Sequence, residues 1–369
     1  MMYKIVCTKC KKKFLKFYKI HLSKQIIKIG MKMASLNIEF IFPLITTIFS
    51  LLFFLSVSEQ YIRKRKTHQL VWAIAIFFFL ITSGAESWSL ILGYWDPLIY
   101  KVYYVLASFQ VAIMGAGALY LFASRNIINE RNSGVACILF GCSWLLFSFI
   151  GQFGSPIFLW ILIPAFLITL LGIFYSIQVI MSSKQEKSPS FNISGMWFSH
   201  LFILFTLYIF IFMVITAISA PLNLDLLLNS GGQEVAGSGW LGTSPDPRPP
   251  IRMFSPLNTV PGSLALIGGA AYSYLTWQLA IKKRSGKFNL KTGLFNVYIG
   301  GGALVLSIAG AMSGFGFGVL YLGEALGVAL MYFGFLESDK ITWRKIVDIL
   351  TLSGIRNKED LSVTDVKED

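Results

Sequence analysis

Charged residues are scarce in this chain. They make up 14% of its 369 residues, whereas hydrophobic residues make up 55%, and an average soluble domain carries about 25% charged residues. Its apolar stretches repeatedly reach the roughly 20 residues that a ~30 Å hydrocarbon core requires, which is longer than buried helices of soluble proteins need. Composition therefore excludes a soluble fold and predicts an all-α, polytopic transmembrane helix bundle.

Cysteine and histidine are also scarce, with four and three residues. Cys7 and Cys10 form the CxxC "CTKC", but no second CxxC or histidine pair follows at zinc-site spacing, so they are only weak candidate metal ligands. His200 is the only histidine inside a predicted span, whereas membrane haems commonly use paired histidines. No P-loop, HExxH or GxSxG motif occurs. No cofactor is predicted, and no catalytic activity is indicated.

Acidic residues are fewer than basic ones, 18 against 32, which gives a net charge of +14. Such an excess can indicate nucleic-acid binding, but here the Lys and Arg residues lie in the amino-terminal segment and in short loops between apolar runs. That placement is typical of membrane topology and excludes a nucleic-acid partner. The lipid bilayer is the expected partner.

The apolar runs predict about nine spans, within a range of seven to nine. These spans cover residues 38–56, 70–93, 98–122, 135–150, 157–181, 196–220, 262–281, 294–312 and 317–335. They form one transmembrane domain over residues 34–337, followed by a short polar tail over residues 338–369. Cationic loops stay in the cytoplasm, and the loops 59–68, 124–133, 182–195 and 282–292 and the tail hold most of the remaining Lys and Arg. We therefore expect a cell-membrane protein with a cytoplasmic carboxyl end.

The basic amino-terminal extension, residues 1–33, conflicts with that orientation. Nine spans put it outside, yet it carries ten lysines and no acid. A start at Met31 or Met33 would remove it from the mature protein. Alternatively, it is an amphipathic segment that lies on an anionic membrane surface.

The long outer connection, residues 221–261, is rich in Gly, Ser and Pro. Such a segment cannot build a core of its own, so we expect a flexible cap or a lid. Pro256 and Pro261 are expected in turns outside helices.

Three ionisable residues are predicted at membrane depth near the outer end. Glu86 lies seven residues before the end of its span, roughly 10 Å deep at ~1.5 Å per residue, and Glu324 lies about as deep in the last span. Lys101 lies one short turn from the span of Glu86, and Tyr104 shares its helix face. Because a charge at this depth costs at least ~2.5 kcal/mol, each should face the interior and have a partner. We predict one polar layer with a direct Glu86–Lys101 contact.

Two functions fit this layer. It is either an outer-leaflet site for transport or binding of a small polar or cationic solute, or a polar clamp that fixes helix register in a non-catalytic scaffold or accessory subunit of a membrane complex. A homo-oligomer is compatible with both. An outer cavity that reaches Glu86 would favour the first.

Glycines spaced four apart favour close helix packing. Gly310 and Gly314, Gly314 and Gly318, and Gly323 and Gly327 have the small-xxx-small spacing that lets helix backbones approach. We therefore expect the last span to lie inside the bundle.

Three stretches resemble a family of prokaryotic multi-pass membrane proteins described as conserved hypothetical proteins. They are "KVYYVLASFQVAIMGAGALYLFASR", "FSPLNTVPGSLALIGGAAYSYLTW" and "YLGEALGVALMYFGFL". The resemblance covers about half of the chain and implies an architecture of about seven spans, with an added helix pair here. It implies no activity and no site residue.

Overall fold

The computed structural model describes residues 38–339, apart from residues 126, 129, 154 and 234 and the segments 185–193, 242–249, 287–292 and 315–318. These residues are helical, and their one β pairing is an isolated bridge between Leu222 and Trp240. The elements are α2 (Ile38–Lys64), α3 (Thr67–Leu92), α4 (Pro97–Ser124), α5 (Glu130–Gln152), α6 (Ile157–Lys184), α7 (Gly195–Ser219), α8 (Leu224–Asn229), η1 (Ala236–Gly239), α9 (Pro250–Ser263), η2 (Leu264–Gly268), α10 (Gly269–Ser285), α11 (Leu294–Gly314) and α12 (Leu320–Asp339).

Eight helices among the described residues are long and apolar enough to cross a membrane. They are α2 to α7, α12 and the continuous segment Pro250–Lys283 that joins α9, η2 and α10. A shorter apolar helix, Leu294–Gly310 within α11, lies between the last two. The predicted all-α polytopic bundle is therefore confirmed, and the nine predicted spans correspond to these eight and α11.

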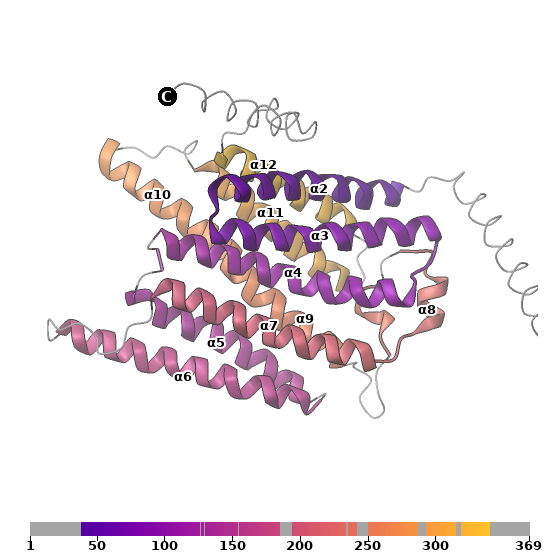
Figure 1. Ribbon diagram of the computed structural model, residues 1–369, viewed down its shortest axis with the longest axis horizontal. Coiled ribbons are helices and arrows are strands. Elements are labelled where there is room, and N and C mark those ends of the chain that lie inside the picture. The colour runs from indigo at the N-terminus through magenta and orange to yellow at the C-terminus, as the bar shows by residue number, and fades with distance from the viewer. Residues whose placement is uncertain are drawn as a thin grey trace, which may run out of the picture.

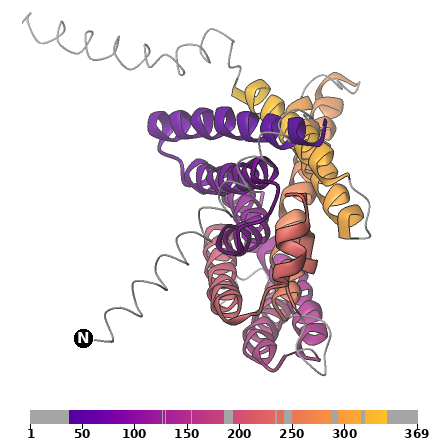
Figure 2. The same ribbon diagram turned by 90° about the vertical axis from the view of Figure 1, so that its right-hand side faces the viewer.

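Helix α4 is the centre of the bundle. The most apolar 18-residue window of α4 is 78% buried, more than that of any other spanning helix described, and α4 packs against α3, α7 and α9. Both views place the α5–α6 hairpin at one edge and the α11–α12 hairpin, which packs on α2, toward the other (Figures 1 and 2). The short helix α8 lies at one end of the bundle, which we call the cap end (Figure 1). The opposite end, where α2 ends and α3 begins, we call the basic end.

The connection between α2 and α3 is much shorter than predicted. The sequence analysis places residues 59–68 in a loop, but α2 continues to Lys64 and α3 begins at Thr67. Only Arg65 and Lys66 remain between them. A helix can extend past the hydrocarbon layer because its backbone bonds are satisfied internally, so Arg63 and Lys64 lie in the last turn of α2 and only two basic residues lie in the connection.

The prediction that Pro256 and Pro261 lie outside helices is wrong. Both are inside α9, which begins at Pro250 and continues through the π-helical turn η2 into α10. Prolines are tolerated inside membrane helices where neighbouring side chains and local π-helical adjustments satisfy the backbone groups that they leave without a partner.

Two aromatic side chains supply such bonds. Pro261 has no N–H, so the carbonyl of Leu257 cannot accept the usual bond from four residues on, and the indole Nε1 of Trp144 in α5 donates to it at 3.2 Å. Pro164 has the same effect on the carbonyl of Trp160 in α6, and the hydroxyl of Tyr208 in α7 donates to that carbonyl at 3.0 Å. These side-chain hydrogen bonds therefore join neighbouring helices at the carbonyls that the prolines leave without a backbone donor.

Glycine contacts show close packing of α12 on α11, but α12 does not lie inside the bundle as expected, because the α11–α12 hairpin lies toward one edge. A Cβ atom on Gly323 would lie 2.1 Å from the Cβ of Ala309 in α11, and one on Gly327 would lie 2.8 Å from the backbone oxygen of Gly302. Both distances are shorter than real Cβ atoms allow. Gly310 differs, because a Cβ there would meet no atom within 4 Å. The predicted Gly323 and Gly327 surface is therefore real, whereas Gly310 does not take part.

The first part of the outer connection is ordered, which corrects the expected flexible cap. Residues 221–233 and 235–241 form a compact cap segment in which Asn223 N donates to Gly239 O and Leu241 N donates to Pro221 O. Leu227 and Trp240 are buried in the core of the molecule. Composition failed to predict this because the segment uses the aromatic ends of α3 and α4 as its core and does not need one of its own.

The Trp144 bond gives a test of these proline positions. We expect Trp144→Phe to lower the free energy of unfolding by about 1 kcal/mol, because a buried carbonyl loses its donor. In a Pro261→Ala background the same change should cost less, since alanine at this position restores the backbone N–H. Unfolding in detergent measured for the four variants gives the coupling. Equal costs in both backgrounds would show that the indole bond does not compensate for the proline.

Candidate functional site

Glu86 is deeply buried in α3. Its exposed fraction is 1%, and Thr82, Ser83 and Ser89 on the same helix are as closely packed. The cap segment covers this end of the helix, since Ser89 Oγ donates to Glu86 O at 2.8 Å and lies 2.9 Å from Gly232 O. Glu86 is therefore closed off from the cap end in this conformation.

Lys101 lies near the start of α4, and its side chain reaches the carboxyl end of α7. Its ammonium donates to the carbonyl of Ile218 at 3.0 Å and to that of Ala220 at 3.4 Å, and it lies 5.8 Å from the ring centroid of Trp240. The last carbonyls of a helix have no partner within the helix, and a cation there is favourable. These bonds do not test the predicted Glu86–Lys101 contact, which stays a prediction.

Tyr104 belongs to an aromatic cluster beneath the cap segment. Its ring lies edge-on to Trp240 at 5.6 Å and 6.2 Å from Tyr100. Trp95, at the turn before α4, packs on Tyr100 and Tyr103 and bonds the cap through its backbone N to Leu227 O and its Nε1 to Gln233 O. Such edge-on and tilted ring pairs contribute about 0.5–1.5 kcal/mol each beyond their burial. The cluster holds the cap end closed.

The other candidate residues are Glu324 and the amino-terminal cysteines. Glu324 is half-buried in α12, a helix that packs on α11 and α2, while α3 packs on α2 and α4. The helices of Glu86 and Glu324 thus share α2 as a neighbour, and a common layer of the two carboxylates stays a prediction. Cys7 and Cys10 lie outside the described residues.

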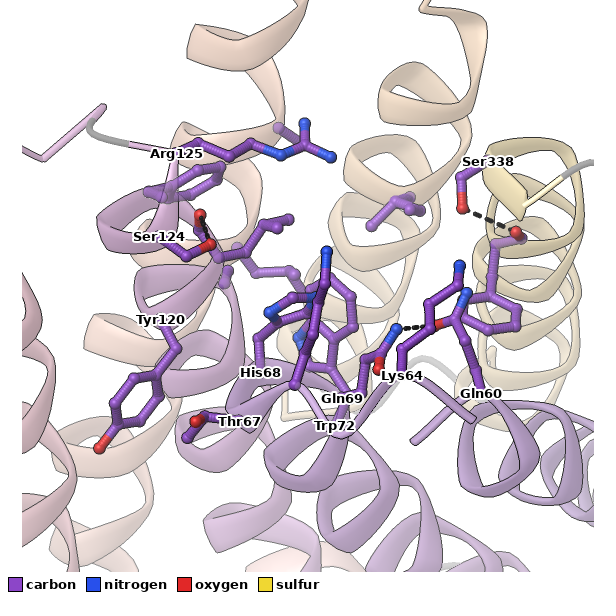
Figure 3. Close-up of a pocket in the computed structure, with 18 of the residues that line it drawn as sticks. Gln60, Lys64, Thr67, His68, Gln69, Trp72, Tyr120, Ser124, Arg125 and Ser338 are labelled. Carbon is purple, nitrogen blue, oxygen red and sulfur yellow. Dashed lines mark hydrogen bonds between the residues drawn. The ribbon is translucent and has the colours of Figure 1, made fainter. Parts of the chain in front are cut away.

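The opposite end of the bundle contains a pocket of about 570 Å³. Its walls come from the ends of α2, α3, α4, α7, α11 and α12 and from the η2–α10 segment. Several of the loops predicted on one side of the membrane therefore adjoin this pocket. Figure 3 shows Arg125 extending across the pocket from α4, opposite Lys64. Its described lining residues contain Lys64, Arg65, Lys66 and Arg125 and no Asp or Glu.

The tight α2–α3 turn positions three of these cations. Arg65 has a φ of 52°, a left-handed conformation that is rare for residues with a side chain, and its N–H donates to Tyr61 O at 2.7 Å, which closes α2. Glycine is the usual residue at such a helix end. An arginine here costs about 1 kcal/mol of backbone strain. Strained positions of this kind cluster at functional sites.

Besides the cations, both polar and apolar side chains line the pocket. Gln60 and Gln69 are 5% and 3% exposed, and Gln69 Nε2 donates to Gln60 Oε1 at 2.7 Å (Figure 3). His68 packs edge-on against Trp72 with ring centroids 5.5 Å apart. The positive charges of Lys66, Arg125 and Lys64 all disfavour a positive charge on His68. The apolar wall consists of Trp72, Leu121, Phe122, Leu266, Ala270, Ile299 and Phe335.

The pocket is not among the sites predicted from the sequence. The run "YIRKRK" indicates only the orientation of the chain, and His68 is expected in a loop, whereas it lies in the first turn of α3. The available signal was "KRKTHQ" beside an apolar span, with Gln60 and Gln69 on the two flanking helices. The lining residues come from eight helical elements, so the site has no contiguous sequence motif.

No protein-family model matches the chain, and neither a curated protein nor a solved structure does. Its helices make it a multi-pass membrane protein in contact with lipid. Any more specific function has to be argued from the geometry of its own side chains. The resemblance to a prokaryotic family stays a prediction.

A double-mutant cycle tests the predicted Glu86–Lys101 contact. Lys101→Met should lower the free energy of unfolding in detergent by about 1 kcal/mol, because α7 loses two bonds to its terminal carbonyls. If the predicted contact forms, the costs of Lys101→Met and Glu86→Gln should depart from additivity by more than about 0.5 kcal/mol, as for residues in contact. Additive costs would contradict the direct contact. Lys283→Met, which removes an exposed lysine at the other end, is the control and should cost little.

Proposed function

We propose that this membrane protein binds an anion, either a small solute or the phosphate of a lipid headgroup, in the pocket at its basic end. The observation that carries the proposal is the lining of that pocket, which holds Lys64, Arg65, Lys66 and Arg125 without an acidic residue among its described members. The volume of about 570 Å³ lies within the range of small-molecule sites, about 300–1,000 Å³.

Physical considerations favour an anion over the cationic solute considered from the sequence. Two unit charges 4 Å apart interact by about 4 kcal/mol at the effective dielectric of a protein surface, so four converging cations would strongly repel a cation. Arginine and lysine both bind phosphate and carboxylate oxygens. An apolar wall beside the cations also suits a ligand with a hydrocarbon part, such as a phospholipid.

We place the basic end in the cytoplasm of a cell. The support is the distribution of Lys and Arg, because cationic segments that flank spans stay on the cytoplasmic side. The cap end would then face outward, and the pocket would draw its ligand from the cytoplasm or from the inner leaflet.

Transport of that anion is the second candidate function. What favours it is the difference between the two ends: the aromatic cluster closes the cap end above Glu86, while the basic end has a pocket. Transporters alternate between such states. Accumulation of labelled phosphate in proteoliposomes would distinguish transport from binding. If the protein binds no anion, the scaffold or accessory-subunit hypothesis is the one that remains.

Binding is tested with inorganic phosphate and protein in phosphatidylcholine nanodiscs, by titration calorimetry. Arg65→Gly should weaken phosphate binding about tenfold, as loss of one charged hydrogen bond implies. Its unfolding temperature should stay constant or rise, because glycine relieves the left-handed backbone. Lost affinity therefore cannot be ascribed to misfolding.

The matched control is Lys283→Gln. Lys283 lies in α10, is exposed, and is not among the pocket-lining residues, so its loss removes the same charge from the same end of the bundle. Its phosphate affinity should stay within twofold of the parent protein. Equal weakening by both variants would show that the effect comes from general surface charge. If the parent protein binds neither phosphate nor a lipid headgroup, the proposal is refuted.

Orientation is tested by labelling with a membrane-impermeant maleimide. In a background in which the four native cysteines are replaced, intact cells should label Asn229→Cys at the cap end and leave Lys283→Cys unlabelled until they are permeabilised. Both positions are exposed. The reverse pattern would place the basic end outside.

A further inference from the structure

Gln69 contains a buried acceptor beside the pocket. The residue is 3% exposed and lines the pocket in the first turn of α3. Its Nε2 donates to Gln60 Oε1, which leaves its own Oε1 as an acceptor with no hydrogen-bond partner among the described residues. Figure 3 places Gln69 next to His68 and Trp72, with Arg125 above them.

A buried carbonyl oxygen without a donor is unfavourable, and most such groups in proteins are satisfied by protein, water or ligand. A carboxylate, a phosphodiester or a fully ionised phosphate monoester cannot satisfy it, because its oxygens are acceptors as well. Lys64, Arg65, Lys66 and Arg125 can hold the anion, whereas Gln69 Oε1 requires an O–H or N–H group. The two halves of the pocket therefore select different parts of one ligand.

The four cations also decide between the two kinds of donor. An ammonium group on the ligand would be repelled by four positive charges in the same pocket, whereas a hydroxyl carries no charge. A free phosphate monoester carries about −1.5 to −2 near pH 7 and matches these cations better than a single carboxylate does, whereas the phosphodiester of a lipid headgroup carries a single negative charge.

We propose that the pocket is specific for a hydroxylated phosphate ester, such as a glycerol phosphate, either free or as a lipid headgroup, whose hydroxyl donates to Gln69 Oε1. This inference rests on the proposed anion binding and adds its specificity. A site built to bond a hydroxyl discriminates strongly against an analogue without it, because its polar group is then left unpaired.

The test compares two ligands that differ only in hydroxyl groups. Glycerol 3-phosphate and propyl phosphate are titrated into the full-length protein in phosphatidylcholine nanodiscs. The parent protein should prefer glycerol 3-phosphate by about tenfold. Gln69→Met, which keeps the length of the side chain and removes its acceptor, should abolish the preference and leave the propyl phosphate affinity within about threefold.

Gln60→Met is the matched control. It removes the same Gln60–Gln69 hydrogen bond but retains the Gln69 amide and its acceptor, so the preference for glycerol 3-phosphate should persist. Unfolding temperatures of both variants show whether the pocket is intact. If Gln60→Met also abolishes the preference, the effect comes from the position of the two amides and the proposed role of Oε1 is refuted.

A lipid arm distinguishes the source of the ligand. Native mass spectrometry compares retention of phosphatidylglycerol with that of phosphatidylethanol, which has the same charge and no headgroup hydroxyl. A Gln69-dependent preference in either arm supports the proposal and identifies the ligand as free or lipid-bound. If phosphates bind in either arm but no arm shows that preference, the specificity is refuted while anion binding stands. If nothing binds, the proposed function fails as well.

Discussion

The structure depends on one constraint of the bilayer: no water is available at its centre to satisfy backbone N–H and C=O groups. Each chain segment that crosses must therefore be helical, and each proline inside a helix must find a donor for the carbonyl that it leaves unbonded. Trp144 and Tyr208 supply such donors from neighbouring helices. Because the helices satisfy themselves, they also continue past the apolar layer, and α2 reaches Lys64 before it turns. The basic pocket exists because of that extension.

The two ends of the bundle use their cations differently. At the cap end, the Lys101 ammonium bonds the terminal carbonyls of α7, and the rings around Trp240 and Tyr100 fill the space below the cap segment. At the basic end, Lys64, Arg65, Lys66 and Arg125 border a cavity that also contains a buried amide acceptor. A cation bonded to helix carbonyls stabilises a fold, whereas cations around a cavity can bind a ligand. This contrast moves the candidate site away from the outer layer.

Local hydropathy predicted the spans well because the length of an apolar run must match the bilayer thickness. It predicted Gly323 and Gly327 correctly because small residues four apart lie on one helix face. The same local rules were wrong for Pro256 and Pro261, whose helical conformation depends on contacts outside the segment, and for the cap segment, whose core lies on α3 and α4. The pocket could not be predicted because its lining residues are far apart in the chain: Gln60 and Gln69 lie on α2 and α3, whereas Arg125 directly follows α4.

The sequence by itself determined that this is an all-α membrane protein. It also determined which segments cross the membrane and which loops lie on the same side of it. Hydrophobicity, helix length and charge distribution act along the chain, so the residues that decide them are neighbours in sequence. Only the tertiary structure decided where Lys101 makes its bonds, how the prolines are accommodated, and that the cations of the α2–α3 turn meet Arg125 and Gln69 around one cavity. Those outcomes depend on distances between helices, which the order of residues within a single helix does not specify.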